Sequence, residues 1–385
     1  MMQRKQGNNN YKPTINMAVD YKPSAMQTKK RSKRWARWLL LTLVFAIVLA
    51  IGFTFVTFRD GYWPAKIENV KIHQRHYTTG IVGNKNMLSV MSYNVKSMES
   101  SEKDFIYTGE NSDDWTSTDT VVTTINNMAK LIEDNNPDII LLQEVDIASK
   151  RTQNINEVEA LLDKISDEYQ YWACAPYLKT RTRTGHVDMQ LCTISKYPIT
   201  QATRYALPNT DNNNLLTRQF QEKRAILGTT IKINGKDYQI YNLHLSRYAQ
   251  HTSATNPQLT ILEDLMANHS DNRFIVGGDF NMLPDKKFLQ YVSQAQQMFY
   301  TQEDQHFKQF FQRYQSIPTL QDLNGANFKN YFTFLDDDGN GYTPDRTIDY
   351  FFIPQSMKLL SYKVVNNDLS LVLSDHIPII VTVAL

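Results

Sequence analysis

The chain has 385 residues, 42% of them hydrophobic and 21% charged, so it has globular composition and the length of one large domain or two small ones. Its net charge of +2 is unevenly distributed, because ten of the 41 Lys and Arg residues but only one of the 39 acidic residues fall within residues 1–37. Residues 38–385 therefore carry 31 basic and 38 acidic residues, a net charge of −7, which argues against a broad basic surface for polyanions and leaves room only for a local basic groove.

The N-terminal part of the sequence predicts a membrane anchor. Residues 1–37 are rich in Asn, Lys, Gln and Pro without apolar periodicity, which predicts a disordered cytoplasmic tail. Residues 38–58, WLLLTLVFAIVLAIGFTFVTF, carry no charge and are about as long as a helix that crosses the roughly 30 Å hydrocarbon core. Because basic residues precede this segment, we expect a single-pass cell-membrane protein with a cytoplasmic N-terminus and the rest of the chain outside.

A cleaved signal peptide is the alternative, since LAIG at residues 49–52 offers a weak cleavage site. The apolar run continues beyond this site, which favours an uncleaved anchor. After the anchor we expect a spacer over residues 59–86 and a single folded domain over residues 87–385.

Two cysteines lie in this domain. Cys174 and Cys192 are equally distant from Arg183 in a turn-like sequence, so a symmetric hairpin would place them face to face. A location outside the cell permits a disulfide, but we expect two buried, unlinked apolar side chains.

Six apolar segments of strand length carry polar or charged residues near one end. They are MLSVMSYN (87–94), DIILLQE (138–144), YQIYNLH (238–244), RFIVGGDFN (273–281), TIDYFFI (347–353) and LVLSDH (371–376). The last segment continues into IPII, so we expect it to form a buried strand. Helical periodicity is present in residues 120–136, in residues 256–269 and in the aromatic stripe Phe307, Phe310, Phe311 and Tyr314. The alternation predicts a layered α/β domain with two packed sheets and helices outside.

The polar residues at these strand ends form a chemically coherent set. They comprise four carboxylates, two amides and two imidazoles: Glu144, Asp279, Asp349, Asp375, Asn94, Asn281, His244 and His376. Carboxylate and amide oxygens suit Mg²⁺, Mn²⁺ or Ca²⁺, whereas zinc favours more histidine or cysteine. A hard cation beside imidazole and carboxylate groups suits hydrolysis of a phosphoester. Each residue alone could be an ordinary turn residue, but six such strand ends are harder to explain in that way.

The segments SYN, LLQEV, NLHLS, GGDFN, RTIDYFF and SDHIPI, in this order, resemble the signature of the endonuclease/exonuclease/phosphatase superfamily. This superfamily includes DNase I-like nucleases, abasic-site endonucleases, inositol polyphosphate 5-phosphatases and neutral sphingomyelinases. The resemblance implies a four-layered α/β/β/α sandwich with its site at the ends of two packed sheets. It also implies a divalent cation, Mg²⁺ or in its place Mn²⁺ or Ca²⁺.

Matched residue by residue, the resemblance implies that Glu144 is the principal metal ligand and that Asn94 supports the metal or the phosphate. It also implies that Asp375 makes a further contact, either with the coordination shell of the metal or with water. Asp279 resembles the residue that positions or deprotonates the attacking water, and Asn281 the residue that steadies the phosphate.

The resemblance also covers the two histidines. His244 matches the histidine that contacts the scissile phosphate, and Asp349 matches the acid that orients His376. Whether His376 acts as a base or as a cationic phosphate clamp stays open. DNase I-like members pair the phosphate-contacting histidine with a second acid, and the sequence has no clear counterpart of that acid.

The signature does not name the substrate. In a nuclease, Lys179, Arg181, Arg183 and Lys196 could contact backbone phosphates, whereas in a lipid enzyme the tether would keep the site near headgroups. We expect a membrane-anchored phosphodiesterase of the nuclease type. The alternatives are a sphingomyelinase-like or other phospholipid or inositol phosphate hydrolase, and an inactive binding module. We expect a monomer without a protein partner.

Overall fold

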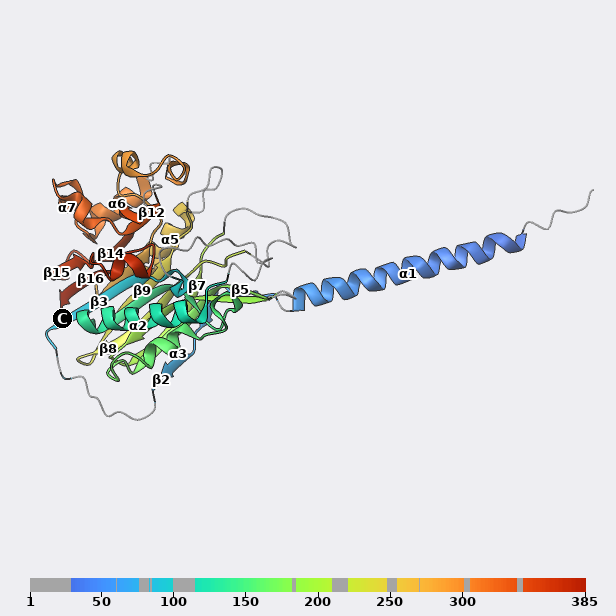
Figure 1. Ribbon diagram of the computed structural model, residues 1–385, viewed down its shortest axis with the longest axis horizontal. Helices are drawn as coiled ribbons and strands as arrows, with labels where there is room; N and C mark the ends of the chain where they lie inside the picture. The colour runs from blue at the N-terminus through green and yellow to red at the C-terminus, as the bar shows by residue number, and fades with distance from the viewer. Residues whose placement is uncertain are drawn as a thin grey trace, which may run out of the picture. The chain divides into compact units, whose positions relative to one another are not determined.

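The computed structural model describes residues 29–59, 61–75, 83, 85–99, 115–181, 185–209, 221–247, 255–269, 271–300, 305–337 and 342–385. The chain divides into two compact units, Met1–Arg59 and Asp60–Leu385 (Figure 1). In the first unit, α1 extends over Lys29–Arg59, and its segment Lys33–Thr54 is long and apolar enough to cross a membrane by length and composition. Most of the expected cytoplasmic tail, residues 1–28, lies outside the described residues.

The second unit contains two seven-stranded sheets and a short hairpin. Sheet A has the strand order β1 (Ile67–Asn69), β7 (Ile199–Ala206), β8 (Ala225–Ile233), β9 (Lys236–His244), β10 (Phe274–Asp279), β14 (Asp349–Ile353) and β11 (Gln315–Ile317). Sheet B has the order β15 (Leu359–Val364), β16 (Ile379–Ala384), β3 (Met87–Asn94), β4 (Ile139–Asp146), β6 (His186–Ser195), β5 (Tyr171–Arg181) and β2 (Ile72–Gln74). The hairpin consists of β12 (Phe334–Asp337) and β13 (Tyr342–Arg346).

The helices are short apart from α1 and α2. The α-helices of the second unit are α2 (Thr118–Asn135), α3 (Glu157–Leu162), α5 (Thr255–Ala267), α6 (Gln305–Arg313), α7 (Leu320–Asn324) and α8 (Ser370–Leu373). Short 3₁₀ helices occur at η1 (Lys96–Met98), η3 (Lys150–Thr152), η4 (Lys286–Tyr291), η5 (Gln297–Phe299) and η6 (Phe328–Tyr331). The three helical segments predicted from periodicity correspond to α2, α5 and α6.

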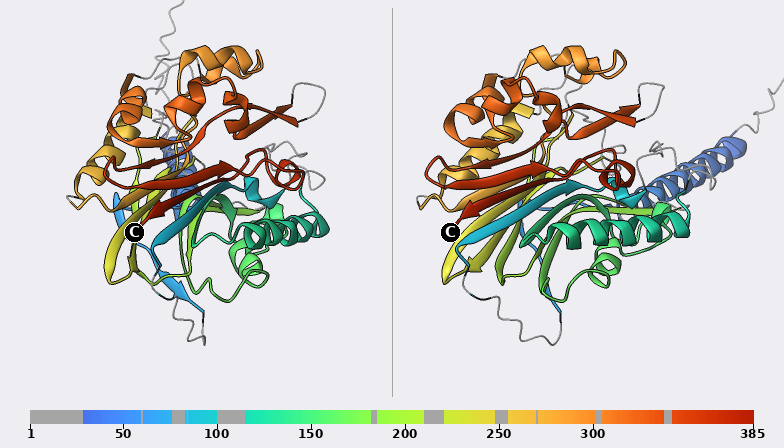
Figure 2. Two further views of the ribbon diagram at one scale, coloured as in Figure 1. Left: turned by 90° about the vertical axis from the view of Figure 1, so that its left-hand side faces the viewer. Right: turned by 60° about the vertical axis from the view of Figure 1, so that its left-hand side comes forward.

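The two sheets pack face to face and helices cover their outer faces, which confirms the expected α/β/β/α sandwich (Figure 2). In β4, Ile139 and Leu141 point into the apolar layer between the sheets, whereas Ile140 and Leu142 pack on the side of α2. This alternation follows from the two-residue period of a strand. On the outer face of sheet A, α5 and the phenylalanines of α6 pack over β10 and β14.

The segment expected to be a spacer, residues 59–86, contributes to the fold. Its strands β1 and β2 pair antiparallel with β7 and β5 at the edges of the two sheets. The compact unit therefore begins before Met87.

The prediction that residues 371–380 form one buried strand is wrong. Residues Ser370–Leu373 form α8, and β16 begins only at Ile379. Asn367 and Ser370 exchange hydrogen bonds, Ser370 N to Asn367 Oδ1 at 2.9 Å and Asn367 N to Ser370 Oγ at 3.0 Å, and this reciprocal capping starts the helix. Pro378 has no N–H for a strand ladder, so β16 starts after it.

The prediction that the two cysteines are unlinked is also wrong. Cys174 and Cys192 lie directly opposite each other in β5 and β6, as the symmetric hairpin predicts, but they form a disulfide. A disulfide across neighbouring strands adds a covalent link to this hairpin.

Gly278 is a position where the sandwich has no room for a side chain. Its φ is 150°, and a Cβ built there would lie 2.0 Å from the carbonyl oxygen of Leu243 on the neighbouring strand β9. We expect Gly278→Ala to destabilise the protein by about 3 kcal/mol or more, because both the backbone conformation and the space exclude a methyl group. Thermal unfolding, monitored by circular dichroism, measures the loss of stability. Gly83→Ala is the control, since among the described residues, chain neighbours aside, no atom lies within 4 Å of the point that its methyl group would occupy. An equal melting temperature for both variants would contradict the expectation.

Candidate active site

The polar ends of the strands meet at one edge of both sheets. In sheet B, β3 and β4 run parallel and bring Asn94 and Glu144 together, and in sheet A, β9 and β10 run parallel and end at His244 and Asp279. Since β14 runs antiparallel to β10, its first residue, Asp349, lies directly opposite Asp279. Asn94 Nδ2 donates to Asp279 Oδ2 at 3.2 Å, so the strand ends of the two sheets are in direct contact.

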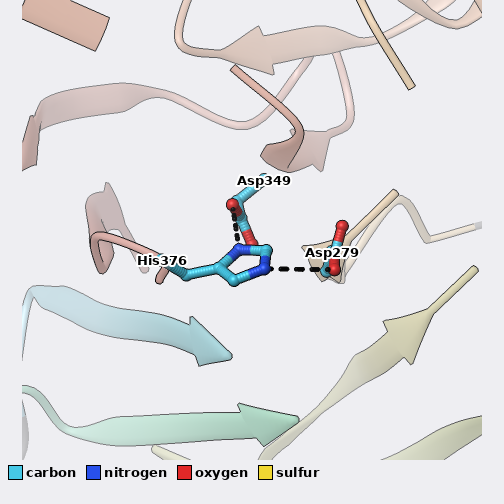
Figure 3. Close-up of side chains that lie close together, drawn as sticks. All are labelled: Asp279, Asp349 and His376. Atoms are coloured by element: carbon cyan, nitrogen blue, oxygen red, sulfur yellow. Dashed lines mark hydrogen bonds and ion pairs between the residues drawn. The ribbon is translucent and has the colours of Figure 1, made fainter. Parts of the chain in front are cut away.

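His376 lies between two buried carboxylates (Figure 3). Its Nδ1 is 2.8 Å from Asp349 Oδ2, and its Nε2 is 3.6 Å from Asp279 Oδ2. The chain around His376 is fixed by its pairing with residues 333–335, because the N–H of Ile377 donates to the carbonyl oxygen of Thr333 at 2.7 Å. A short extended segment beside a hairpin thus holds the imidazole, although the expected strand is absent.

These contacts shift the pKa of both central groups. Burial raises the pKa of Asp279 to about 7, although the charge on His376 opposes this shift. Burial alone would lower the pKa of His376, but the carboxylates of Asp349 and Asp279 raise it to about 10. At neutral pH the site therefore contains an imidazolium beside a carboxyl group close to its midpoint, which suits proton transfer.

Glu144 and Asp375 form the more exposed part of the site, with side chains 27% and 20% exposed. Asn94 Nδ2 donates to Glu144 Oε1 at 3.0 Å, and Lys96 Nζ lies 3.9 Å from Asp375 Oδ2. Burial and the charge of Asp375 both raise the pKa of Glu144, so these two carboxylates repel each other.

The donor set around Glu144 fits a hard divalent cation. A cation would relieve the repulsion between Glu144 and Asp375, and carboxylate and amide oxygens are its preferred ligands. A separate group, Asp279, Asp349 and His376, offers ligand atoms that all lie within 4.8 Å of one another. In that group, however, the His376 ring already uses Nδ1 in its hydrogen bond to Asp349. We therefore regard Glu144, Asp375 and Asn94 as the better metal candidates.

The backbone has a positive φ at three site residues. The values are 44° at Lys96, 58° at Glu144 and 53° at Asn281, in a region that residues other than glycine seldom adopt and that asparagine adopts more readily than the other two. Glu144 lies where the pairing of β4 with β6 shifts register, between Leu142 and Val145. Such a bulge re-aims a side chain, and strain of this kind is concentrated at functional sites.

Asn281 and Arg247 border Asp279. The N–H of Asn281 donates to Asp279 Oδ1 at 2.8 Å, and its side-chain Nδ2 donates to the carbonyl oxygen of Leu245 at 3.0 Å. Arg247 is exposed, and its Nε donates to Asn281 Oδ1 at 3.3 Å. An exposed guanidinium at the rim of a site can bind an anionic substrate group.

His244 is buried beside Asp279. Its Nε2 lies 3.2 Å from Asp279 Oδ2, and its Nδ1 lies 3.3 Å from the hydroxyl of Tyr177. Burial, followed by the charges of Arg224 and His376, lowers the pKa of His244 well below its usual value. Arg224 also donates from Nη1 to the carbonyl oxygen of His244 at 3.2 Å.

The eight strand-end residues expected to form the site lie together: Asn94, Glu144, His244, Asp279, Asn281, Asp349, Asp375 and His376. The sequence interpretation missed Lys96, Tyr177, Arg224 and Arg247. A single tyrosine or arginine beside an apolar strand carries no local signal. Only Arg247, three residues after His244, could have been found from its place in NLHLSR.

The basic residues that could contact nucleic-acid backbones differ in their exposure and in their ion pairs. The interpretation of Lys196 is wrong, because its side chain is 1% exposed and pairs with Glu168 at 2.9 Å. Lys179 is exposed but pairs with Asp188 at 2.6 Å. Arg181 is exposed at the end of β5, and Arg183 lies outside the described residues.

The chain is similar to known proteins in sequence and in fold. The model of the Endonuclease/Exonuclease/phosphatase family matches residues 91–376. No curated protein matches the chain. An endonuclease/exonuclease/phosphatase structure from Beutenbergia cavernae DSM 12333 is 18% identical with a TM-score of 0.51, and the match covers 78% of this chain and 72% of that chain.

Two further solved structures are similar. A family protein from Leptotrichia buccalis C-1013-b is 17% identical with a TM-score of 0.48, over 77% of this chain and 100% of that chain. The human Nocturnin catalytic domain with bound sulfate anion is 14% identical with a TM-score of 0.48, over 82% of this chain and 96% of that chain. At these identities, the structural likeness concerns the fold.

Proposed function

The chain belongs to the endonuclease/exonuclease/phosphatase family, whose members are divalent-metal-dependent phosphoester hydrolases, and from this premise we propose that it is a phosphodiesterase tethered to the cell membrane with its catalytic domain outside the cytoplasm. The observation that carries the proposal is the imidazole of His376 between Asp349 and Asp279, beside the carboxylates of Glu144 and Asp375. The N-terminal segment Lys33–Thr54 supports the tether, and the basic residues before it support a cytoplasmic N-terminus.

Glu144, Asp375 and Asn94 would hold the cation, for which Mg²⁺ is our first candidate and Mn²⁺ or Ca²⁺ the alternatives. When bound, the cation supplies charge stabilisation for a non-bridging phosphate oxygen. Asn281 fixes one carboxylate oxygen of Asp279, while the other faces both histidines.

Asp279 accepts a proton from the attacking water, and its raised pKa suits this role near neutral pH. His376, charged and aligned by Asp349, binds a phosphate oxygen as charge develops on it. His244 donates a hydrogen bond to a second oxygen of the same phosphate, and Asn281 steadies that group.

A phosphodiester suits the site better than a phosphomonoester. In the part of the chain that the structure describes, Lys96, Arg224 and Arg247 border the site. Lys96 pairs with Asp375, and Arg224 pairs with Glu222 at 2.6 Å. A monoester carries up to two negative charges and calls for more free cations than a diester, which carries one.

Nucleic acid is the first candidate substrate, as in the nuclease branch of the family, and a phospholipid headgroup is the second. One feature specifically favours the second candidate. Tyr62, near the start of the second unit, already donates to the carbonyl oxygen of Pro176 at 3.3 Å, and only two residues separate it from the last residue of α1. So short a connection to a membrane-spanning helix would limit the reach of the enzyme to substrates near the membrane.

The test uses the full-length protein in detergent micelles with Mg²⁺, Mn²⁺ or Ca²⁺. The substrates are plasmid DNA, sphingomyelin-containing vesicles, bis(4-nitrophenyl) phosphate and 4-nitrophenyl phosphate. Metal-dependent cleavage of DNA and of the synthetic diester supports the nuclease assignment, and headgroup release with intact DNA moves the enzyme to the lipid phosphodiesterases. Cleavage of the monoester alone would overturn the diester assignment.

The proposed roles also set the pH dependence. We expect kcat/KM to rise as pH increases through about 7, where Asp279 loses its proton, and to fall near pH 10, where His376 loses its charge. Asp349→Asn removes the main group that raises the pKa of His376, so the alkaline fall should move to lower pH. The pH profiles of kcat/KM for both proteins on bis(4-nitrophenyl) phosphate measure this shift of the alkaline limb. An unchanged alkaline limb in the variant would contradict the role given to Asp349.

A further inference from the structure

His244 has a tyrosine beside its second ring nitrogen, at the place for which the sequence shows no clear acid. The hydroxyl of Tyr177 lies 3.3 Å from Nδ1 of His244, and the two rings meet edge to face with centroids 5.7 Å apart. On the other side of the imidazole, Nε2 lies 3.2 Å from Asp279 Oδ2. We propose that Tyr177 is a positioning residue that fixes the tautomer of His244 and so keeps the proton on Nε2, the nitrogen that faces Asp279 and would face the reacting phosphate. This inference rests on the proposed phosphodiesterase function.

The two neighbours of the imidazole differ in what they can do. In the ionised form that acts as the base, Asp279 only accepts hydrogen bonds, whereas the hydroxyl of Tyr177 can donate one. Burial and the charge of Glu144 raise the pKa of Tyr177 well above its usual value, so this hydroxyl keeps its proton. The arrangement that satisfies both contacts has the proton on Nε2 and the lone pair on Nδ1.

Among the described residues, Glu144 is a further group near Nδ1. Its Oε1 lies 3.7 Å away, beyond hydrogen-bond distance, and already accepts from Asn94 Nδ2 at 3.0 Å. If Glu144 holds the cation, it is even less available to the histidine. The hydroxyl of Tyr177 is therefore the nearer partner of Nδ1.

The backbone of β5 positions Tyr177 beside His244. The pairing of β5 with β6 shifts register between Pro176 and Leu178, so Tyr177 sits in a bulge and points between the sheets together with Leu178. Pro176 O accepts hydrogen bonds from Arg204 Nε at 2.9 Å and from the hydroxyl of Tyr62 at 3.3 Å.

Further contacts keep the bulge and the ring in place. The N–H of Lys223 donates to the carbonyl oxygen of Tyr177, and the guanidinium of Arg224 lies over the Tyr177 ring at 5.6 Å. Arg224 also donates to the carbonyl oxygen of His244, so one residue contacts both members of the pair. Tyr177 is 1% exposed and has little freedom to leave His244.

The first test reads the tautomer directly and needs no substrate. Full-length protein with ¹⁵N-labelled histidine is studied by NMR in detergent micelles without metal, and the His244 signals are assigned with the His244→Asn variant. We expect a bare Nδ1 and a protonated Nε2 in the wild type, and a mixture of tautomers in Tyr177→Phe. A proton on Nδ1 in the wild type, or His244 signals that Tyr177→Phe leaves unchanged, would overturn the proposal.

The second test is kinetic and uses bis(4-nitrophenyl) phosphate. We expect Tyr177→Phe to lower kcat about 10- to 100-fold with little change in KM, as for other residues that orient a site group. In a His244→Ala background the same change should have no further effect, because Tyr177 acts through His244. An equally large loss in that background would overturn the proposal.

Tyr169→Phe is the matched control. Tyr169 is also buried, but its hydroxyl donates to the carbonyl oxygen of Pro137 at 2.7 Å, within the apolar cluster under α2. We expect this control to leave both kcat and the His244 signals unchanged. If the wild type cleaves none of the substrates, the proposed function fails, whereas the NMR measurement still decides the role of Tyr177.

Discussion

Replacing His376 with alanine is expected to lower kcat for phosphodiester hydrolysis by about a thousand-fold or more, because the change removes a cation aimed at the developing phosphate charge. His376 is buried between Asp349 and Asp279, so neither water nor a mobile side chain can easily take its place. Its charge also persists across the neutral range, since these carboxylates raise its pKa to about 10 despite burial. Initial rates of bis(4-nitrophenyl) phosphate hydrolysis measure the effect.

The fold should survive this change. The imidazole packs edge-on against Phe334 at 4.9 Å between centroids, outside the large apolar clusters that join the sheets and helices. His269→Ala is the matched control, because His269 is a half-buried histidine near the end of α5 that contacts Tyr241 at 2.6 Å. We expect native circular dichroism from both variants. Wild-type rates in His376→Ala would contradict the central role of this histidine.

Replacing Glu144 with glutamine is expected to weaken cation binding at least about a hundred-fold and to abolish metal-dependent turnover. Glutamine keeps the size of the side chain but removes one of the two carboxylates that would hold the cation. Because Glu144 and Asp375 repel each other in the metal-free protein, the substitution also relieves this repulsion. The metal-free variant should therefore be at least as stable as the metal-free wild type.

Thermal unfolding with and without Mn²⁺ separates these effects without relying on activity. A cation at a hundred times its dissociation constant stabilises the folded state by about 2.7 kcal/mol, so the melting temperature of the wild type should rise. The Glu144→Gln variant should show little rise, whereas the control Glu159→Gln, on the exposed surface of α3, should behave like the wild type. An equal rise in Glu144→Gln would remove this residue from the metal site.

Much of the sandwich could be predicted because its strands carry a strong local signal. The segment MLSVMSYN was expected as a strand and forms β3 with the same bounds, Met87–Asn94. Asn94, Glu144, His244 and Asp279 were found for the same reason, since each stands where an apolar run stops. The short helix α8 was missed because reciprocal hydrogen bonds of Asn367 and Ser370 outweigh the apolar pattern there.

The geometry that makes the site could not be predicted from local patterns. The bulges at Glu144 and Tyr177 depend on how β4 and β5 pair with β6, and register between strands is not encoded in either strand alone. The contact between Tyr177 and His244 joins the two sheets across 67 positions of sequence. The disulfide could not be decided from sequence either, because directly opposed cysteines are compatible with both the linked and the unlinked state.

The most direct test of metal-dependent phosphodiester hydrolysis is the rate at which full-length protein cleaves bis(4-nitrophenyl) phosphate with and without Mn²⁺, compared with the Glu144→Gln and His376→Ala variants. We expect turnover that requires the cation in the wild type and is lost in both variants. Equal rates in all three proteins, or no turnover by the wild type of this diester, DNA or sphingomyelin with Mg²⁺, Mn²⁺ or Ca²⁺, would contradict the proposed function.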